Sequence, residues 1–233
     1  MLGPPISTAA SSAGPKQPAA RTAPASSPDG ASAPALAPTV APTRARLLAA
    51  ARELIEEGGF ARASVAAITD RAGLAAGTLY RHFAAKEELF VELFREACER
   101  ELEAMAHAAA RPGPATPQSE RVVELLLTFA RRALRAPRLA WALLAEPVGP
   151  RVERERLAYR ARYRQLAAEV LTAAIAAGEL PAQDPELSAA ALVGACGEAL
   201  IGPLAPAAAG ALEGDALLAE LAAFVRRAIG ACA

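Results

Sequence analysis

The stretch Ser64–Leu89, with the sequence SVAAITDRAGLAAGTLYRHFAAKEEL, constrains the fold of this chain more than any other feature. Its apolar residues are spaced as in two short helices, with a tight turn between them and a third helix behind. Gly73 marks the turn, because a glycine directly after a helical segment adopts the left-handed backbone conformation without steric cost. We therefore expect the first helix to end at Ala72, and a helix–turn–helix to follow from this spacing.

Each of the two short helices has one apolar face. In the first, Ser64 stands where an N-cap belongs, and one face carries Val65, Ile68 and Ala72. In the second, Leu79 and Phe83 lie four residues apart and are expected to be buried. The other side chains of the second helix are polar, aromatic or basic, namely Thr78, Tyr80, Arg81 and His82. A short helix of this kind suits the major groove of DNA.

Two longer helices flank the pair. The first is predicted from Thr43, as a cap, to Glu57, and Gly58-Gly59 ends it. The second runs from Lys86 to about Ala110 and would link this module to the rest of the chain.

The pattern AGLxxGTLYRHFxxKEEL, preceded by an amphipathic helix that ends in Gly-Gly-Phe, resembles the TetR/AcrR family of bacterial transcriptional regulators over residues 44–95. The resemblance implies that the helix after the turn is the recognition helix. It also implies that Thr78 and Tyr80 contact phosphate or base edges and that Arg81 faces the groove. The full set of implied DNA contacts is Arg44, Ser64, Gly77, Thr78, Tyr80, Arg81, His82 and Lys86.

Several of these assignments have ordinary alternatives. Tyr80 can equally be a half-buried aromatic, His82 a surface histidine and Arg44 a solvated arginine. The chain also departs from the family, since Ala75 and Ala76 stand where relatives often carry Ser-Lys. The operator sequence therefore does not follow from these residues.

The net charge of the chain is zero, but residues 44–86 carry seven positive and four negative side chains. This local surplus is enough for phosphate contacts and predicts a moderate salt dependence of DNA binding. Alanine, leucine, arginine and glutamate dominate over β-branched and aromatic residues, so we expect an all-α chain.

We expect four regions: a disordered Ala/Pro/Ser-rich tail at 1–42, the helix–turn–helix domain at 43–90, a connecting helix at 91–111 and an effector-binding and dimerisation domain at 117–233. Cys98, Cys196 and Cys232 form no CxxC pair, which fits a reducing cytoplasm. No catalytic spacing, metal site or cofactor motif is evident.

The segment Leu187–Leu212 carries Glu198 as its one charged residue and must be buried somewhere. A membrane span is disfavoured, because alanine and glycine insert weakly and Pro203 and Pro206 interrupt the helix. With the last helix it resembles the two-helix dimer face of the TetR/AcrR family, so we expect a homodimer and no membrane.

Between the two ends we expect an effector pocket lined by Phe129, Trp141, Tyr159, Arg160 and Tyr163, with Leu144 beside them and Arg156 or Arg160 meeting an anionic group. The alternative is that these aromatics are core and that the arginines form a solvated face. The predicted function is a dimeric repressor, not an enzyme, that leaves a palindromic double-stranded DNA operator when a small molecule binds. A helical interaction protein that keeps the fold without sequence-specific DNA binding is the alternative.

Overall fold

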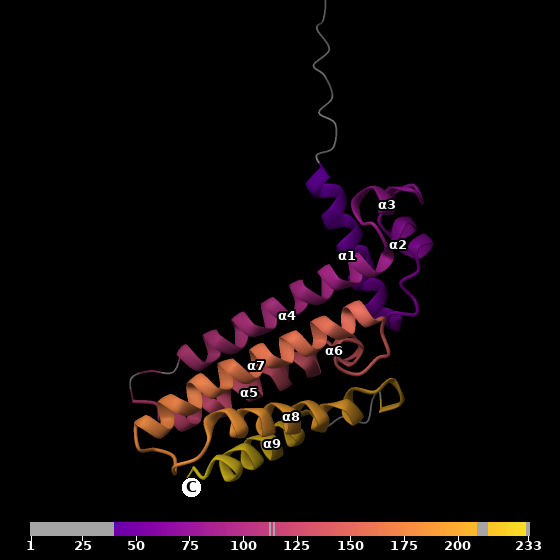
Figure 1. The fold of residues 1–233 in the computed structure, drawn as a ribbon. Coiled ribbons are helices and arrows are strands. Elements are labelled where there is room, and N and C mark those ends of the chain that lie inside the picture. The colour runs from indigo at the N-terminus through magenta and orange to yellow at the C-terminus, as the bar shows by residue number, and fades with distance from the viewer. Residues whose placement is uncertain (1–39, 112, 114, 209–213, 232–233) are drawn as a thin grey trace, which may run out of the picture. The chain divides into compact units, whose positions relative to one another are not determined.

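The computed structural model describes residues 40–111, 113, 115–208 and 214–231, and these residues form helices and loops without a strand (Figure 1). The helices are α1 Val40–Gly58, α2 Val65–Arg71, α3 Thr78–His82, α4 Lys86–Ala110, α5 Gln118–Arg135, α6 Pro137–Leu144, α7 Pro150–Ala176, α8 Pro185–Leu204 and α9 Gly214–Ile229, with a 3₁₀ turn at Pro206–Ala208. The predicted all-α class is confirmed. Cys232 and residues 1–39 of the predicted tail lie outside the described residues.

Helix α1 begins at Val40, three residues before the predicted start at Thr43. Pro42 falls in its first turn, where a backbone N–H has no partner within the helix and its loss costs little. The helix ends at Gly58 as predicted, and Gly59 follows with φ 78°. Its apolar stripe is buried in the core of the module, with Leu47, Ala51 and Ile55 fully enclosed.

The helix–turn–helix has the predicted local structure. The Ser64 Oγ accepts a hydrogen bond from the Ala67 N–H at 3.1 Å and so caps α2. After Ala72, Gly73 has φ 63°, and the Leu74 N–H donates to the Thr69 carbonyl at 2.8 Å. These contacts close the C-terminus of α2 and direct the chain into α3.

Replacing Gly73 by alanine is expected to lower the free energy of unfolding by about 1–2 kcal/mol, because an L-residue is strained in the left-handed region. Gly77→Ala is the matched control, since Gly77 has φ −73° and open space where its Cβ would lie. Thermal denaturation of both variants checks this. Equal stability of the two would contradict the assignment of the turn to Gly73.

The C-terminal part is built from α5 to α9, and Figure 1 shows α5 and α7 running alongside α4. Proline occupies the first turn of α6, α7 and α8, where its fixed φ favours a helix start. The three helices accordingly begin at Pro137, Pro150 and Pro185.

Helix α8 is long and apolar enough to cross a membrane by length and composition, yet only 28% of its most apolar window is buried within the single chain. One face packs inward through Ala189, Leu192, Cys196, Leu200 and Leu204. The opposite face exposes small and apolar residues, namely Leu187, Ala191, Gly194 and Gly202, together with the carboxylate of Glu198. Exposed apolar surface of this kind is typical of interaction sites.

Candidate nucleic-acid interface and effector cavity

Helix α3 is buried on one face and exposes two large side chains to solvent on the other. Leu79 and Phe83 are 0% and 1% exposed and anchor the helix to the core. Tyr80 is 60% exposed and Arg81 is also exposed. Within the described part of the chain, neither side chain forms a hydrogen bond or ion pair, so both are free to contact a ligand. This is the arrangement that a recognition helix requires.

The other predicted contacts surround α3. Gly77 precedes the helix as its N-cap and is exposed, with no atom near the position of a Cβ. Thr78 and His82 are partly exposed at the two ends of α3, and Ser64 is exposed at the start of α2. Lys86 opens α4 with its Nζ 5.2 Å from the centre of the Phe90 ring. The structure thus brings these side chains to the region around α3.

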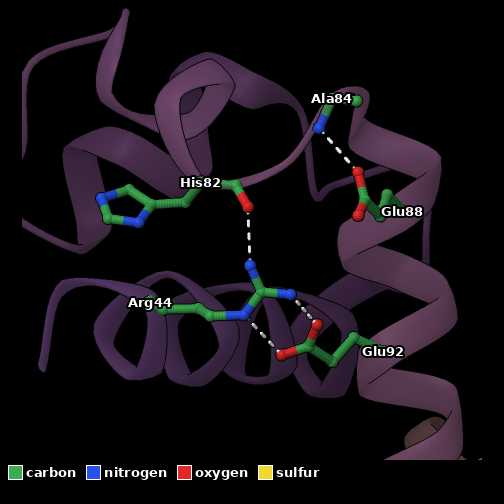
Figure 2. A network of polar contacts seen from close by, with 5 residues as sticks. All are labelled: Arg44, His82, Ala84, Glu88 and Glu92. Atoms are coloured by element: carbon green, nitrogen blue, oxygen red, sulfur yellow. Dashed lines mark hydrogen bonds and ion pairs between the residues drawn. The ribbon is translucent and has the colours of Figure 1, made fainter. Parts of the chain in front are cut away.

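Arg44 forms contacts within the module (Figure 2). Its guanidinium forms an ion pair with Glu92 of α4, with one hydrogen bond of 2.9 Å, and donates to the His82 carbonyl at 2.6 Å. It also lies over the Phe83 ring, 4.2 Å from the ring centre. The hydrogen bond to Glu92 raises the pKa of Arg44 further. Arg44 therefore fastens the C-terminal end of α3 to α4, and its predicted phosphate contact would have to use the N–H groups that these bonds leave over.

Figure 2 also shows a second tie at the same corner, where the Ala84 N–H donates to the Glu88 carboxylate at 2.6 Å. The Glu88 carboxylate, three residues beyond the N-cap of α4, thereby binds a free backbone N–H at the start of this helix. The loop between α3 and α4 is therefore held at both ends.

Two further arginines brace the module from α1 and α2. Arg46 of α1 donates to the Ala72 carbonyl at 2.5 Å, so it supports the turn between α2 and α3. Arg71 of α2 binds Glu57 of α1 through two hydrogen bonds of 2.7 and 3.0 Å. Both contacts join residues far apart in the sequence, so spacing alone could not reveal them.

A cavity of about 810 Å³ lies between α4, α5, α6, α7 and α8. Four of the five predicted effector residues line it, namely Phe129, Tyr159, Arg160 and Tyr163, and so does Leu144. Trp141 does not line the cavity, and its ring centre lies 5.5 Å from the Arg138 guanidinium. Most of the remaining wall is aliphatic, aromatic or arginine.

Arg156 borders the cavity, but its guanidinium already forms hydrogen bonds within the protein. It is 9% exposed, and its guanidinium donates to the carbonyls of Leu143 at 2.8 Å and Glu146 at 2.9 Å, and to the Glu153 carboxylate at 2.5 Å. The alternative in which Arg156 meets an anionic group is therefore unfavourable. Arg160, one turn further along α7, is exposed.

Both cysteines among the described residues are buried and line the cavity. Burial raises the pKa of the Cys98 thiol to about 12 and that of Cys196 to about 11. Almost no thiolate is present near pH 7, so neither cysteine has the environment of a reactive thiol.

Glu146, which follows α6, connects the cavity side of the molecule to the helix–turn–helix. Both of its oxygens accept from the Phe60 N–H, at 3.1 and 3.2 Å, just after α1. Phe60 in turn packs edge-to-face on Phe90 of α4, with ring centres 5.0 Å apart. Since Arg156 holds the Glu146 carbonyl, a continuous set of contacts runs from the cavity wall to α1.

Residues 47–93 match the family of bacterial regulatory proteins of the tetR family. The N-terminal part of the chain is thus a TetR-family domain. The matched residues contain α2, the turn and α3, so the exposed side chains of α3 belong to a DNA-binding helix–turn–helix.

Known proteins agree with this placement. The transcriptional regulator UidR of Escherichia coli is 46% identical over 61 residues, which are 26% of this chain and 31% of UidR. The chain thus matches less than a third of the length of this curated relative. A TetR/AcrR-family regulator from Thermobifida fusca has a TM-score of 0.61 at 27% identity, covering 78% of this chain and 95% of its own.

The fold extends over the C-terminal part as well. The regulator FadR from Bacillus subtilis, solved in complex with stearoyl-CoA, has a TM-score of 0.67 at 21% identity and covers 78% of this chain and 96% of its own. This likeness shows that the two proteins share a fold over α5 to α9 as well as over the helix–turn–helix.

Proposed function

We propose that this TetR-family chain is a dimeric transcriptional repressor that binds a palindromic operator and leaves it when a small molecule occupies the cavity. The observation that carries the proposal is the exposed pair Tyr80 and Arg81 on α3, which have no hydrogen-bond or ion-pair partner among the described residues. The proposed contacts to DNA are Ser64, Gly77, Thr78, Tyr80, Arg81, His82 and Lys86. Arg44 is left out, because its guanidinium is bound within the module.

Binding to DNA from upstream of the chain's own gene and its neighbours tests this proposal. Fluorescence anisotropy at physiological salt, with nonspecific competitor DNA, should show binding that the competitor does not abolish. The rival class, a helical interaction protein that keeps the fold, predicts binding that competitor removes or no binding at all. We place the protein in the cytoplasm with the DNA, and we assign it no enzymatic step.

The exposed apolar face of α8 supports a homodimer through α8 and α9. Leu187 is 69% exposed and Phe224 of α9 is 39% exposed. Two such faces can bury each other in a four-helix bundle, which would place two recognition helices about one DNA turn apart.

The variant Ala191→Arg is expected to convert the dimer to a monomer, because it places a charge on the exposed face of α8. Ala106→Arg on the exposed face of α4 is the matched control and should remain dimeric. Light scattering after size-exclusion chromatography distinguishes them. A monomeric unmodified chain would refute the proposed interface.

The set of contacts from the cavity through Arg156 and Glu146 to Phe60 supports an effector-dependent mechanism. A ligand need only bind one arrangement of the helices better than the other. A coupling of about 1–3 kcal/mol would lower operator affinity roughly 5- to 150-fold.

A further inference from the structure

The cavity carries more positive charge than its own carboxylates can neutralise. Seven arginines and two glutamates line it. Four of the arginines have a carboxylate partner: Arg52 with Glu56, Arg100 with Glu96, Arg132 with Glu101 and Arg156 with Glu153. Over residues 40–231, excluding the undescribed gaps, the other three form no ion pair, namely Arg135, Arg160 and Arg164.

These three arginines line the cavity and are exposed to solvent. Arg160 and Arg164 lie four residues apart on α7 and therefore stand on one face of the helix. Two like charges at this spacing repel each other, and a bound anion would remove the repulsion. Glu198 of α8 also lines the cavity and is exposed, but it pairs with none of them.

The interior has the opposite character. Its buried wall is largely apolar and includes Phe94, Met105, Leu126 and Leu139. Glu101 lies there beside Arg132 at 2.8 Å, and its Oε1 is buried and accepts no hydrogen bond. A second anion placed next to Glu101 would lack a counter-ion, so an acidic ligand is favoured only with its charge at the opening.

We propose that the cavity binds an anionic amphipath, with an apolar body against the inner wall and its acidic head on Arg135, Arg160 and Arg164. The volume of about 810 Å³ is in the range of sites that enclose a drug-sized molecule. The regulatory meaning of this binding rests on the proposed function, whereas the binding itself can be measured without DNA. A carboxylate and a phosphate head share the chemistry that these arginines recognise.

Isothermal titration of the full chain tests the proposal with three probes of equal chain length, each below its micelle concentration: dodecanoate, dodecyl phosphate and dodecanol. We expect at least one of the two acids to bind about tenfold or more tightly than dodecanol, because each charge-assisted contact adds to the affinity. The better acid identifies the head group. Equal affinity for dodecanol and for both acids, or no binding by any probe, would overturn the proposal.

The double variant Arg160→Gln, Arg164→Gln keeps most of each side chain and removes both charges. It should weaken acid binding about tenfold to a hundredfold and leave dodecanol binding unchanged. The control Arg151→Gln, Arg154→Gln removes two exposed charges from the same helix outside the cavity wall, and acid binding should persist. Loss of acid affinity in both double variants, or in neither, would contradict the assignment.

Operator binding, measured separately by anisotropy, keeps the two proposals apart. A chain that binds the operator but no acid refutes the ligand class and leaves the repressor proposal intact. A chain that binds acids through Arg160 and Arg164 but binds no operator supports the ligand class and refutes the repressor proposal.

Discussion

Tyr80→Ala is expected to weaken operator binding about 10- to 100-fold, since a contact to a base edge or phosphate from the recognition helix is worth about 1–3 kcal/mol. The side chain is 60% exposed, so its removal leaves no cavity in the core. The thermal denaturation midpoint and the oligomeric state should therefore not change. Anisotropy titration with a labelled operator, alongside melting curves, separates the two effects.

Two controls sharpen this measurement. Tyr80→Phe retains the ring and removes the hydroxyl, so it tells whether stacking or hydrogen bonding carries the contact. Leu157→Ala removes another exposed apolar side chain, 57% exposed on α7, outside the helix–turn–helix. Unchanged operator affinity in Tyr80→Ala would contradict the assignment of the DNA contact to α3.

Arg156→Met is expected to lower the free energy of unfolding by about 2–5 kcal/mol, because it leaves buried carbonyls without a donor. The carbonyls of Ala142 and Leu143 belong to the last turn of α6, where no backbone N–H of the helix reaches them. Arg156 supplies that missing donor from α7. At about 2–4 °C per kcal/mol for a chain of this size, the melting temperature should fall clearly.

The matched control is Arg160→Met, one turn further along α7, where the exposed guanidinium has no ion-pair partner among the described residues. It should melt close to the unmodified chain. Hydrogen exchange at Phe60 gives a second readout, because its N–H is bound by Glu146, whose carbonyl Arg156 holds. Equal melting temperatures for the two methionine variants would refute the role of Arg156 as the cap of α6.

Much of the local structure follows from the sequence. Ser64 caps α2, Gly73 makes the turn, and proline begins three of the later helices, as the residues predict. Each of these features depends on the conformation of a few consecutive residues, which their side chains largely determine. The spacing of Leu79 and Phe83 likewise sets which side of α3 is buried, and so which side is exposed.

Tertiary structure decided what the charged residues do. Arg44 was expected near a phosphate but binds Glu92, 48 positions along the chain, and Glu146 reaches Phe60 across 86 positions. Trp141 falls outside a cavity whose wall comes from five helices and Arg52 of α1. A long side chain with several donors or acceptors can satisfy them in solvent or against any neighbour. Its partner is therefore chosen by how the helices pack, and periodicity along the sequence does not contain that information.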